Sequence, residues 1–223
     1  MTSLMDKSPK ERASLLQDWQ KQYELVSGNL LSMDLSRGKP AADQLALSDA
    51  LENAIDGDYR AKDGTDVRNY GGLRGLPEAR ALGAELLETP AAHVIAGGNS
   101  SLALMHLVIR TALDKGLWQD ERAWAKADAP TLITPVPGYD RHFTLTAALG
   151  INMLNVELTD KGPNMDQVRS LIADDPNIKG IWNVPKYSNP TGCTYSDATV
   201  AQMAALPNDA AADDFVVLWD NAY

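Results

Sequence analysis

The sequence predicts an α/β protein of three layers, in which helices cover both faces of a mostly parallel sheet. From about residue 77 onwards, short apolar segments with strand composition alternate with helical segments. This alternation is typical of a parallel sheet covered by helices. The chain has 223 residues, 44% of them hydrophobic, so it is long enough to bury the core that such layers require.

The elements can be placed along the chain. A first helix is expected from Ser8 to Gly28, because Ser8 opens a capping box and apolar residues follow at helical spacing. Residues 30–75 are rich in Gly, Asp and Arg and predict an extended arm. Strands are expected at 93–96, 131–134, 153–158, 180–184 and 215–220, and helices at 77–87, 102–113, 140–149, 164–173 and 196–206.

Charge and composition exclude several classes of protein. The net charge is −10, and since phosphate binding needs clustered Lys and Arg, we expect no nucleic-acid partner. The charged amino-terminal segment predicts neither a signal peptide nor a membrane span. The single Cys193 excludes an internal disulfide and favours the cytoplasm. His93, His106 and His142 lack ligand spacing, so no metal site is expected, and His106 is expected on a helix against the core.

Ligands of open α/β sheets bind beyond the carboxyl ends of the strands, so the loops there are the candidate sites. The first is Gly97-Gly98-Asn99-Ser100-Ser101, between an expected strand and a helix. Its glycines permit close backbone approach, and the helix start offers free N–H groups and a positive dipole end. It is either a phosphate cradle or an ordinary capped turn. It matches neither the P-loop nor the dinucleotide fingerprint.

Three further loops carry polar or aromatic side chains. In Asn189-Pro190-Thr191-Gly192, the Asn before Pro is held extended, so its side chain can project from a fixed backbone. Pro137-Gly138-Tyr139 places an aromatic ring after a tight turn, where it can stack on a flat ligand or pack in the core. Asp220-Asn221-Ala222-Tyr223 places a carboxylate at a strand end and a hydroxyl three residues later. Each has an ordinary turn explanation when it is taken alone.

Together these loops contain the groups that a pyridoxal phosphate site needs. They supply a phosphate cradle, an aromatic plate, an amide donor, and an acid with a nearby phenol. The acid keeps the pyridine nitrogen protonated, which makes the ring an electron sink, while amide and phenol donors reach the ring hydroxylate. We therefore expect pyridoxal 5'-phosphate (PLP) as the cofactor.

The chain resembles the PLP-dependent class I/II aminotransferases of fold type I, and among them the aspartate aminotransferases. The resemblance rests on NYGGLRGLPEAR, AGGNSS, PVPGYDRH, NPTG and DNAY, and runs from about Leu35 to the end. LSRGKP (Leu35 to Pro40) is similar to a bacterial branch that includes actinobacterial members. The resemblance implies two parts. Residues 1–60 would be a helix and arm belonging to a smaller domain, and residues 61–223 a large PLP-binding domain, incomplete at its carboxyl end.

The resemblance assigns roles to the cofactor-binding residues. Gly98, Asn99 and Ser100 would hold the cofactor phosphate. Tyr139 would stack on the ring, where many relatives have Trp, and Asp220 would bind the pyridine nitrogen. His142 follows the ring-stacking turn, and we hypothesise that it tunes the site through Asp220.

Other roles concern the ring oxygen, the substrate and a second subunit. Asn189 and Tyr223 would bind the ring hydroxyl oxygen. Tyr70 would reach the cofactor phosphate of the neighbouring subunit, which implies a homodimer. Gly38 would lie against the substrate carboxylate.

The chain departs from the family in lacking a lysine beyond the D-x-x-Y tyrosine. That lysine forms the internal aldimine and moves the proton, but the last lysine here is Lys186 and the last arginine is Arg169. The catalytic lysine and the carboxylate-binding arginine would therefore lie beyond Tyr223, in a longer enzyme of which this is the amino-terminal half. Such an enzyme would move an amino group between an acidic amino acid, aspartate above all, and a 2-oxo acid such as 2-oxoglutarate.

Other functions remain open on the same residues. A PLP-dependent lyase or decarboxylase would use the same cofactor contacts. A ligand-sensing module of a transcription regulator can reuse the fold, but it would need a basic winged-helix domain ahead of the acidic arm. A catalytically inactive binding protein would lack the lysine altogether.

Overall fold

The computed structural model describes residues 4–28, 38–54, 57–118 and 122–223. The chain divides into two compact units: Met1–Arg60 with Asp66–Arg68, and Ala61–Thr65 with Asn69–Tyr223. The first unit contains the helices α1 (Pro9–Ser27) and α2 (Ala42–Ala46) and the short 3-10 helices η1 (Leu4–Asp6) and η2 (Asp49–Asn53). Of the LSRGKP stretch, residues 35–37 lie outside the described residues.

The expected first helix is confirmed in α1. Its capping box is formed, because the Ser8 amide donates to Glu11 Oε2 (2.8 Å) and the Glu11 amide donates to Ser8 Oγ (3.4 Å). None of the residues of α1 is buried, and Trp19 is half exposed. The helix is therefore stabilised at its start by local hydrogen bonds rather than by packing.

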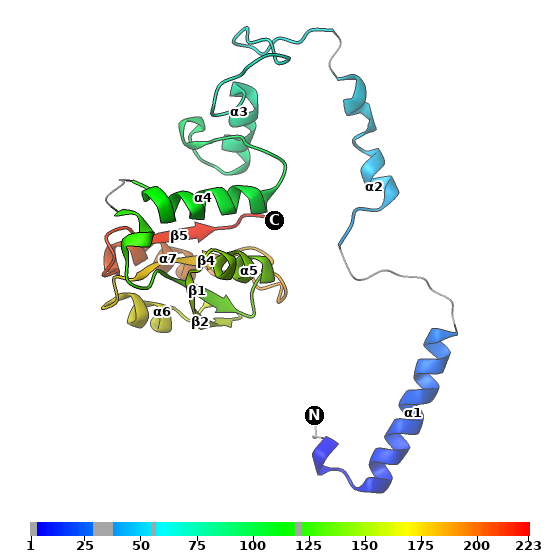
Figure 1. The fold of residues 1–223 in the computed structure, drawn as a ribbon. Helices are drawn as coiled ribbons and strands as arrows, with labels where there is room; N and C mark the ends of the chain where they lie inside the picture. The colour runs from blue at the N-terminus through cyan, green and yellow to red at the C-terminus, as the bar shows by residue number, and fades with distance from the viewer. Residues whose placement is uncertain (1–3, 29–37, 55–56, 119–121) are drawn as a thin grey trace. The chain divides into compact units, whose positions relative to one another are not determined.

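The second unit contains a five-stranded sheet (Figure 1). The strand order is β3-β2-β1-β4-β5, and all neighbouring pairs are parallel except β2 and β3. The strands are β1 (Thr131–Val136), β2 (Asn152–Thr159), β3 (Gly162–Pro163), β4 (Ile178–Asn183) and β5 (Val216–Trp219). The predicted mostly parallel sheet is confirmed.

Helices connect the parallel strands, as the sequence predicts. Asn164 and Ser196 cap two of them, since their side chains accept hydrogen bonds from the amides of Gln167 and Thr199. The connecting helices are α5 (Asp140–Ala148), α6 (Met165–Ile172) and α7 (Asp197–Asp209). The helices α3 (Pro77–Leu86) and α4 (Ser101–Lys115) and the 3-10 turns η3 (Ala91–His93) and η5 (Trp124–Lys126) precede β1.

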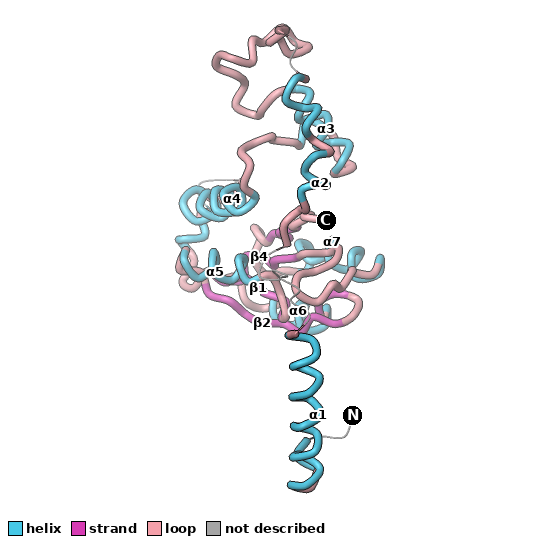
Figure 2. The backbone as a smooth tube through the Cα atoms, turned by 90° about the vertical axis from the view of Figure 1, so that its right-hand side faces the viewer, coloured by secondary structure: helices cyan, strands magenta, loops and turns pink. Residues whose placement is uncertain are grey.

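The sheet has a separate hydrophobic core on each face, because successive strand side chains point to opposite sides. Leu132 and Trp182 pack with the buried residues of α4 in one cluster. Ile133 and Ile181 pack with the buried residues of α6 and α7 in the other. Figure 2 shows α4 and α5 on one side of the strands and α7 on the other. This is the three-layer arrangement expected from the sequence.

Two expectations were wrong. Residues 93–96 form no strand: the turn Ala91–His93 is followed by irregular backbone up to Ser100. Arginine side chains bind this segment instead, as Arg80 donates to the carbonyls of Ala91 and Val94. His106 is exposed on α4 rather than packed against the core.

One edge of the sheet stays without a partner strand. β5 pairs with β4 along one side, and within the described ranges no strand lies along its other side. In the same ranges, no helix combines the length and the apolar character needed to cross a bilayer.

The first prediction concerns the close pairing of β4 and β5. A Cβ added to Gly180 would lie 2.5 Å from the Val216 carbonyl oxygen and 2.9 Å from Val216 Cγ2. Gly180→Ala should therefore lower the free energy of unfolding by about 1–3 kcal/mol, measured by urea denaturation. The control is Gly71→Ala, because a Cβ there would meet nothing within 4 Å. Equal urea midpoints for the two variants would contradict the sheet packing described here.

Candidate active site

The parallel strands bring three of the candidate loops to one edge of the sheet. β1, β4 and β5 run in the same direction, so the loops that follow them emerge side by side. Between these loops lies a cavity of about 150 Å³. It is lined by Ser101, Tyr139, Val184, Asn189, Asp220, Ala222 and Tyr223. The structure thus brings together four residues that the sequence singles out: Tyr139, Asn189, Asp220 and Tyr223.

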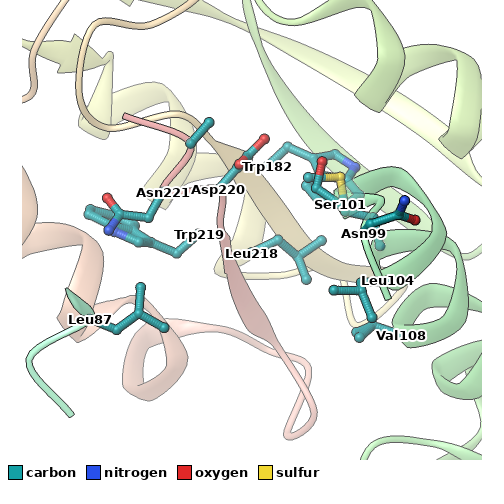
Figure 3. A pocket seen from close by; sticks show the side chains of 12 residues that line it. Leu87, Asn99, Ser101, Leu104, Val108, Trp182, Leu218, Trp219, Asp220 and Asn221 are labelled. Carbon is teal, nitrogen blue, oxygen red and sulfur yellow. The ribbon is translucent and has the colours of Figure 1, made fainter. Parts of the chain in front are cut away.

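A second, larger cavity adjoins the first. Its volume is about 750 Å³, and it shares Ser101, Asp220 and Ala222 with the smaller one. In Figure 3, Leu104 and Val108 of α4 lie on one side of it and Leu218 of β5 lies on the other. Its size is within the range of small-molecule and cofactor sites, about 300–1,000 Å³.

Asp220 is held at the junction of the two cavities. Its amide donates to the carbonyl of Asn183 (2.8 Å), so the pairing of β5 with β4 extends to this residue. Its carboxylate oxygen Oδ2 accepts a hydrogen bond from Nε2 of His142 (3.0 Å). The Asp220 side chain is only 11% exposed. With Oδ2 engaged, Oδ1 is the oxygen available to a ligand.

His142 is itself fixed on several sides. The imidazole is stacked on the ring of Trp182 at 4.3 Å, and the ring of Tyr139 meets it edge-on at 5.1 Å. The Trp182 Nε1–H donates to Thr146 Oγ1 (3.0 Å), and that hydroxyl donates to the His142 carbonyl (2.7 Å). The sheet and α5 therefore set the orientation of the Asp220 carboxylate through His142.

The start of α4 has the geometry of an anion site. Gly98 has a φ of +57°. No atom lies within 4 Å of the position that a Cβ would occupy, so the space beside the backbone is open at this turn. Ser100 caps the helix by accepting from the Ala103 amide (3.3 Å). The amides of Ser101 and Leu102 belong to the first turn, where the helix supplies no carbonyl partner. The stretch is thus a capped turn that still presents free donors and the positive dipole end.

Residues that the motifs did not single out also line the cavities. Trp182 and Leu218 reach the larger cavity from the strands, and Leu104 and Val108 reach it from α4. The alternation of side chains along a strand marks Trp182 and Leu218 as sharing a face with the core around α4. Ser101, the first residue of α4, lies in both cavities, although nothing in its motif distinguishes it from Ser100.

Several of the singled-out residues are not among those that line the two cavities, Gly98 and Ser100 included. Tyr70 is 99% exposed and lines neither of them. Gly38 is exposed and belongs to the first unit. Lys186 is exposed in the loop after β4. The roles assigned to Tyr70 and Gly38 therefore stay predictions.

Two side chains near the site, a thiol and a phenol, are of a type that can act as nucleophiles but are not activated here. Burial raises the pKa of the Cys193 thiol, and its Sγ donates to the Thr159 carbonyl (3.2 Å). Burial raises the pKa of Tyr195 well above its usual value, and its hydroxyl donates to Asn183 Oδ1 (3.3 Å). Both groups stay protonated near neutral pH, so neither is an activated nucleophile.

Comparison with known proteins identifies the family. The sequence model described as aspartate amino-transferase matches residues 7–223. The chain belongs to the aspartate aminotransferase family. The aspartate aminotransferase of Corynebacterium glutamicum is 40% identical over 222 residues, which are 99% of this chain and 51% of that protein. A Mycolicibacterium smegmatis protein, named provisionally as an aminotransferase, is 45% identical over 208 residues, covering 92% of this chain and 48% of its own.

Solved structures of aminotransferases share this fold. The aspartate transaminase of C. glutamicum superposes with a TM-score of 0.87 at 40% identity, covering 100% of this chain and 52% of that one. The α-aminoadipate aminotransferase LysN of Thermus thermophilus gives a TM-score of 0.62 at 18% identity, covering 92% and 50%. The predicted fold is therefore confirmed as the large domain of fold type I. The chain spans about half the length of the curated relatives that it matches.

The second prediction concerns His142. His142→Ala should lower the free energy of unfolding by about 2–4 kcal/mol, because it removes a buried ring and leaves the Asp220 carboxylate without its donor. The matched control is His106→Ala, on the exposed face of α4, which should change stability by less than about 0.5 kcal/mol. Urea denaturation of both variants measures the difference. A similar, small effect for both would show that His142 does not organise the site.

Proposed function

We propose that this chain is the cofactor-binding part of a PLP-dependent aminotransferase. The enzyme moves an amino group between an acidic amino acid, aspartate above all, and a 2-oxo acid such as 2-oxoglutarate. Membership of the aspartate aminotransferase family supports the reaction. The name of the C. glutamicum relative supports aspartate as the amino donor.

The observation that carries the proposal is the Asp220 carboxylate, held by His142 at the end of β5 and facing both cavities. PLP needs an anion beside its pyridine nitrogen, and an acid fixed by a buried imidazole fits that need. The same fold holds a phosphopyridoxyl compound in LysN. When bound, PLP supplies an electron sink that stabilises negative charge on a substrate carbon.

The residues around Asp220 fit the remaining parts of the cofactor. The negative charge of Asp220 favours a proton on a nearby ring nitrogen. Tyr139 offers a flat face at the wall of the smaller cavity. The Asn189 amide and the Tyr223 hydroxyl are donors suited to a ring oxygen. For the phosphate, the proposal uses the start of α4, with Gly98, Asn99 and Ser100.

The proposal assigns the missing catalytic groups to polypeptide beyond this chain. The curated relatives are about twice as long as the matched segment. Leu218 and Trp219 of β5 line an apolar groove, in which Leu104 and Val108 of α4 are 40% and 43% exposed. A further strand laid along β5 would cover this groove and continue the sheet. In this proposal, the lysine and the carboxylate-binding arginine belong to that additional part.

The proposal also includes a homodimer in the cytoplasm. Tyr70 and Leu73 are almost fully exposed, so both side chains are accessible to a second subunit. In the dimer, Tyr70 would reach the cofactor phosphate of the neighbouring subunit. Gly38 would lie near the substrate carboxylate.

The third prediction tests the role of Asp220. The chain should bind PLP, and Asp220→Ala should weaken binding by about tenfold or more, since it removes a charge-assisted contact. Asp213→Ala is the control, because that side chain is 84% exposed and lines neither cavity of the site. Equilibrium dialysis with detection of PLP absorbance measures both constants. Failure of the unmodified chain to bind PLP would refute the proposed function.

The fourth prediction concerns Lys186. Because the proposal places the covalent lysine outside this chain, Lys186→Ala should change the PLP dissociation constant by less than about twofold. Borohydride treatment of the PLP-loaded chain, followed by peptide mapping, should label Lys186 no more than Lys161, which is also exposed. Selective and stoichiometric labelling of Lys186 would contradict the proposal.

A further inference from the structure

Tyr187 has an unusual backbone conformation beside the candidate site. Among the described residues other than glycine, Glu88 and Tyr187 have positive φ values, 51° and 50°. Glu88 follows Leu87, the residue that caps the end of α3, and such a conformation is common at that position. Tyr187 follows no helix. It lies in the loop after β4, and for a bulky side chain the left-handed region is a genuine outlier.

The loop holds Tyr187 in this conformation from both sides. The Tyr187 amide donates to Thr194 Oγ1 (3.3 Å). The amides of Ser188 and Tyr195 donate to the carbonyls of Cys193 and Pro185, each at 2.8 Å. The two arms of the loop are therefore fastened to each other on either side of Tyr187.

Burial of the ring does not explain the conformation. The Tyr187 residue is 64% exposed. Its ring contact is with Tyr223, edge-on, with centroids 6.4 Å apart and planes at 81°. Tyr223 lines the smaller cavity together with Asn189 and Asp220. Asn or Gly would adopt the left-handed backbone at lower cost, but neither could make this contact.

We propose that Tyr187 is a positioning residue for Tyr223. Its left-handed backbone directs the ring against the Tyr223 ring and so sets where the Tyr223 hydroxyl lies at the mouth of the cavity. This inference rests on the proposed function, because it takes the Tyr223 hydroxyl as a donor to PLP. Strained backbone conformations that the surrounding structure maintains occur preferentially at functional sites.

The experiment compares PLP binding across a double-mutant cycle in the full chain. Tyr187→Asn keeps a residue that tolerates positive φ but removes the ring, and should weaken PLP binding by about three- to tenfold, the range of an aromatic pair. Tyr187→Phe keeps the ring and should restore most of the affinity. Tyr23→Asn, at a 74% exposed tyrosine of α1, should leave the dissociation constant unchanged.

The decisive comparison uses Tyr223→Phe. If Tyr187 acts through the Tyr223 hydroxyl, adding Tyr187→Asn to Tyr223→Phe should weaken binding by less than about twofold more. The same loss in both backgrounds would overturn the inference. So would wild-type affinity in Tyr187→Asn.

A second measurement needs no cofactor. Tyr187→Asn and Tyr187→Ala both lose the ring contact, but Asn adopts the left-handed region more readily than Ala, so Tyr187→Asn should unfold at a higher urea concentration than Tyr187→Ala. Equal midpoints for the two variants would mean that the conformation carries no energetic cost, and would overturn the inference. If the unmodified chain binds no PLP, the proposed function fails. The urea comparison then still decides whether the conformation is maintained against an energetic cost.

Discussion

The parallel pairing of β5 with β4 is the constraint on which the candidate site depends. Gly180 has no side chain, so the Val216 carbonyl can lie directly against it, and the ladder continues through Asp220. That register fixes the position of Asp220, and so of its carboxylate, relative to the end of β4. It also carries Tyr223 towards the loop after β4, where Asn189 lies. A shift of one residue would turn the carboxylate to the opposite face of the sheet.

The polar groups of the site are held by the same packing that forms one of the two cores. Trp182 belongs to the cluster around α4, yet its ring supports His142 and its N–H binds Thr146. Asp220 therefore needs little rearrangement to accept a ligand. Such preorganisation strengthens the interaction of a fixed carboxylate with a positive charge that develops on a bound ring.

Most of the fold and part of the site could be predicted from the sequence. Local signals were sufficient for the capping box of α1 and for the helix caps at Asn164 and Ser196. Alternating strand and helix composition was sufficient for β1, β2, β4 and β5 and the helices between them. Residues 93–96 have strand composition, but a strand also needs a neighbouring strand, and the Val94 carbonyl accepts a hydrogen bond from Arg80 instead. The positive φ of Tyr187 could not be predicted from the sequence, because it arises from hydrogen bonds across the loop rather than from its residue type.

The most direct test of the account is the protonation state of the cofactor ring. PLP labelled with ¹⁵N at its pyridine nitrogen can be bound to the chain and followed by NMR as the pH rises. If the carboxylate held by His142 faces that nitrogen, the ring should stay protonated at pH values where free PLP has lost its proton. A bound ring that titrates like the free cofactor would show that Asp220 does not serve it, and the proposed cofactor site would be wrong.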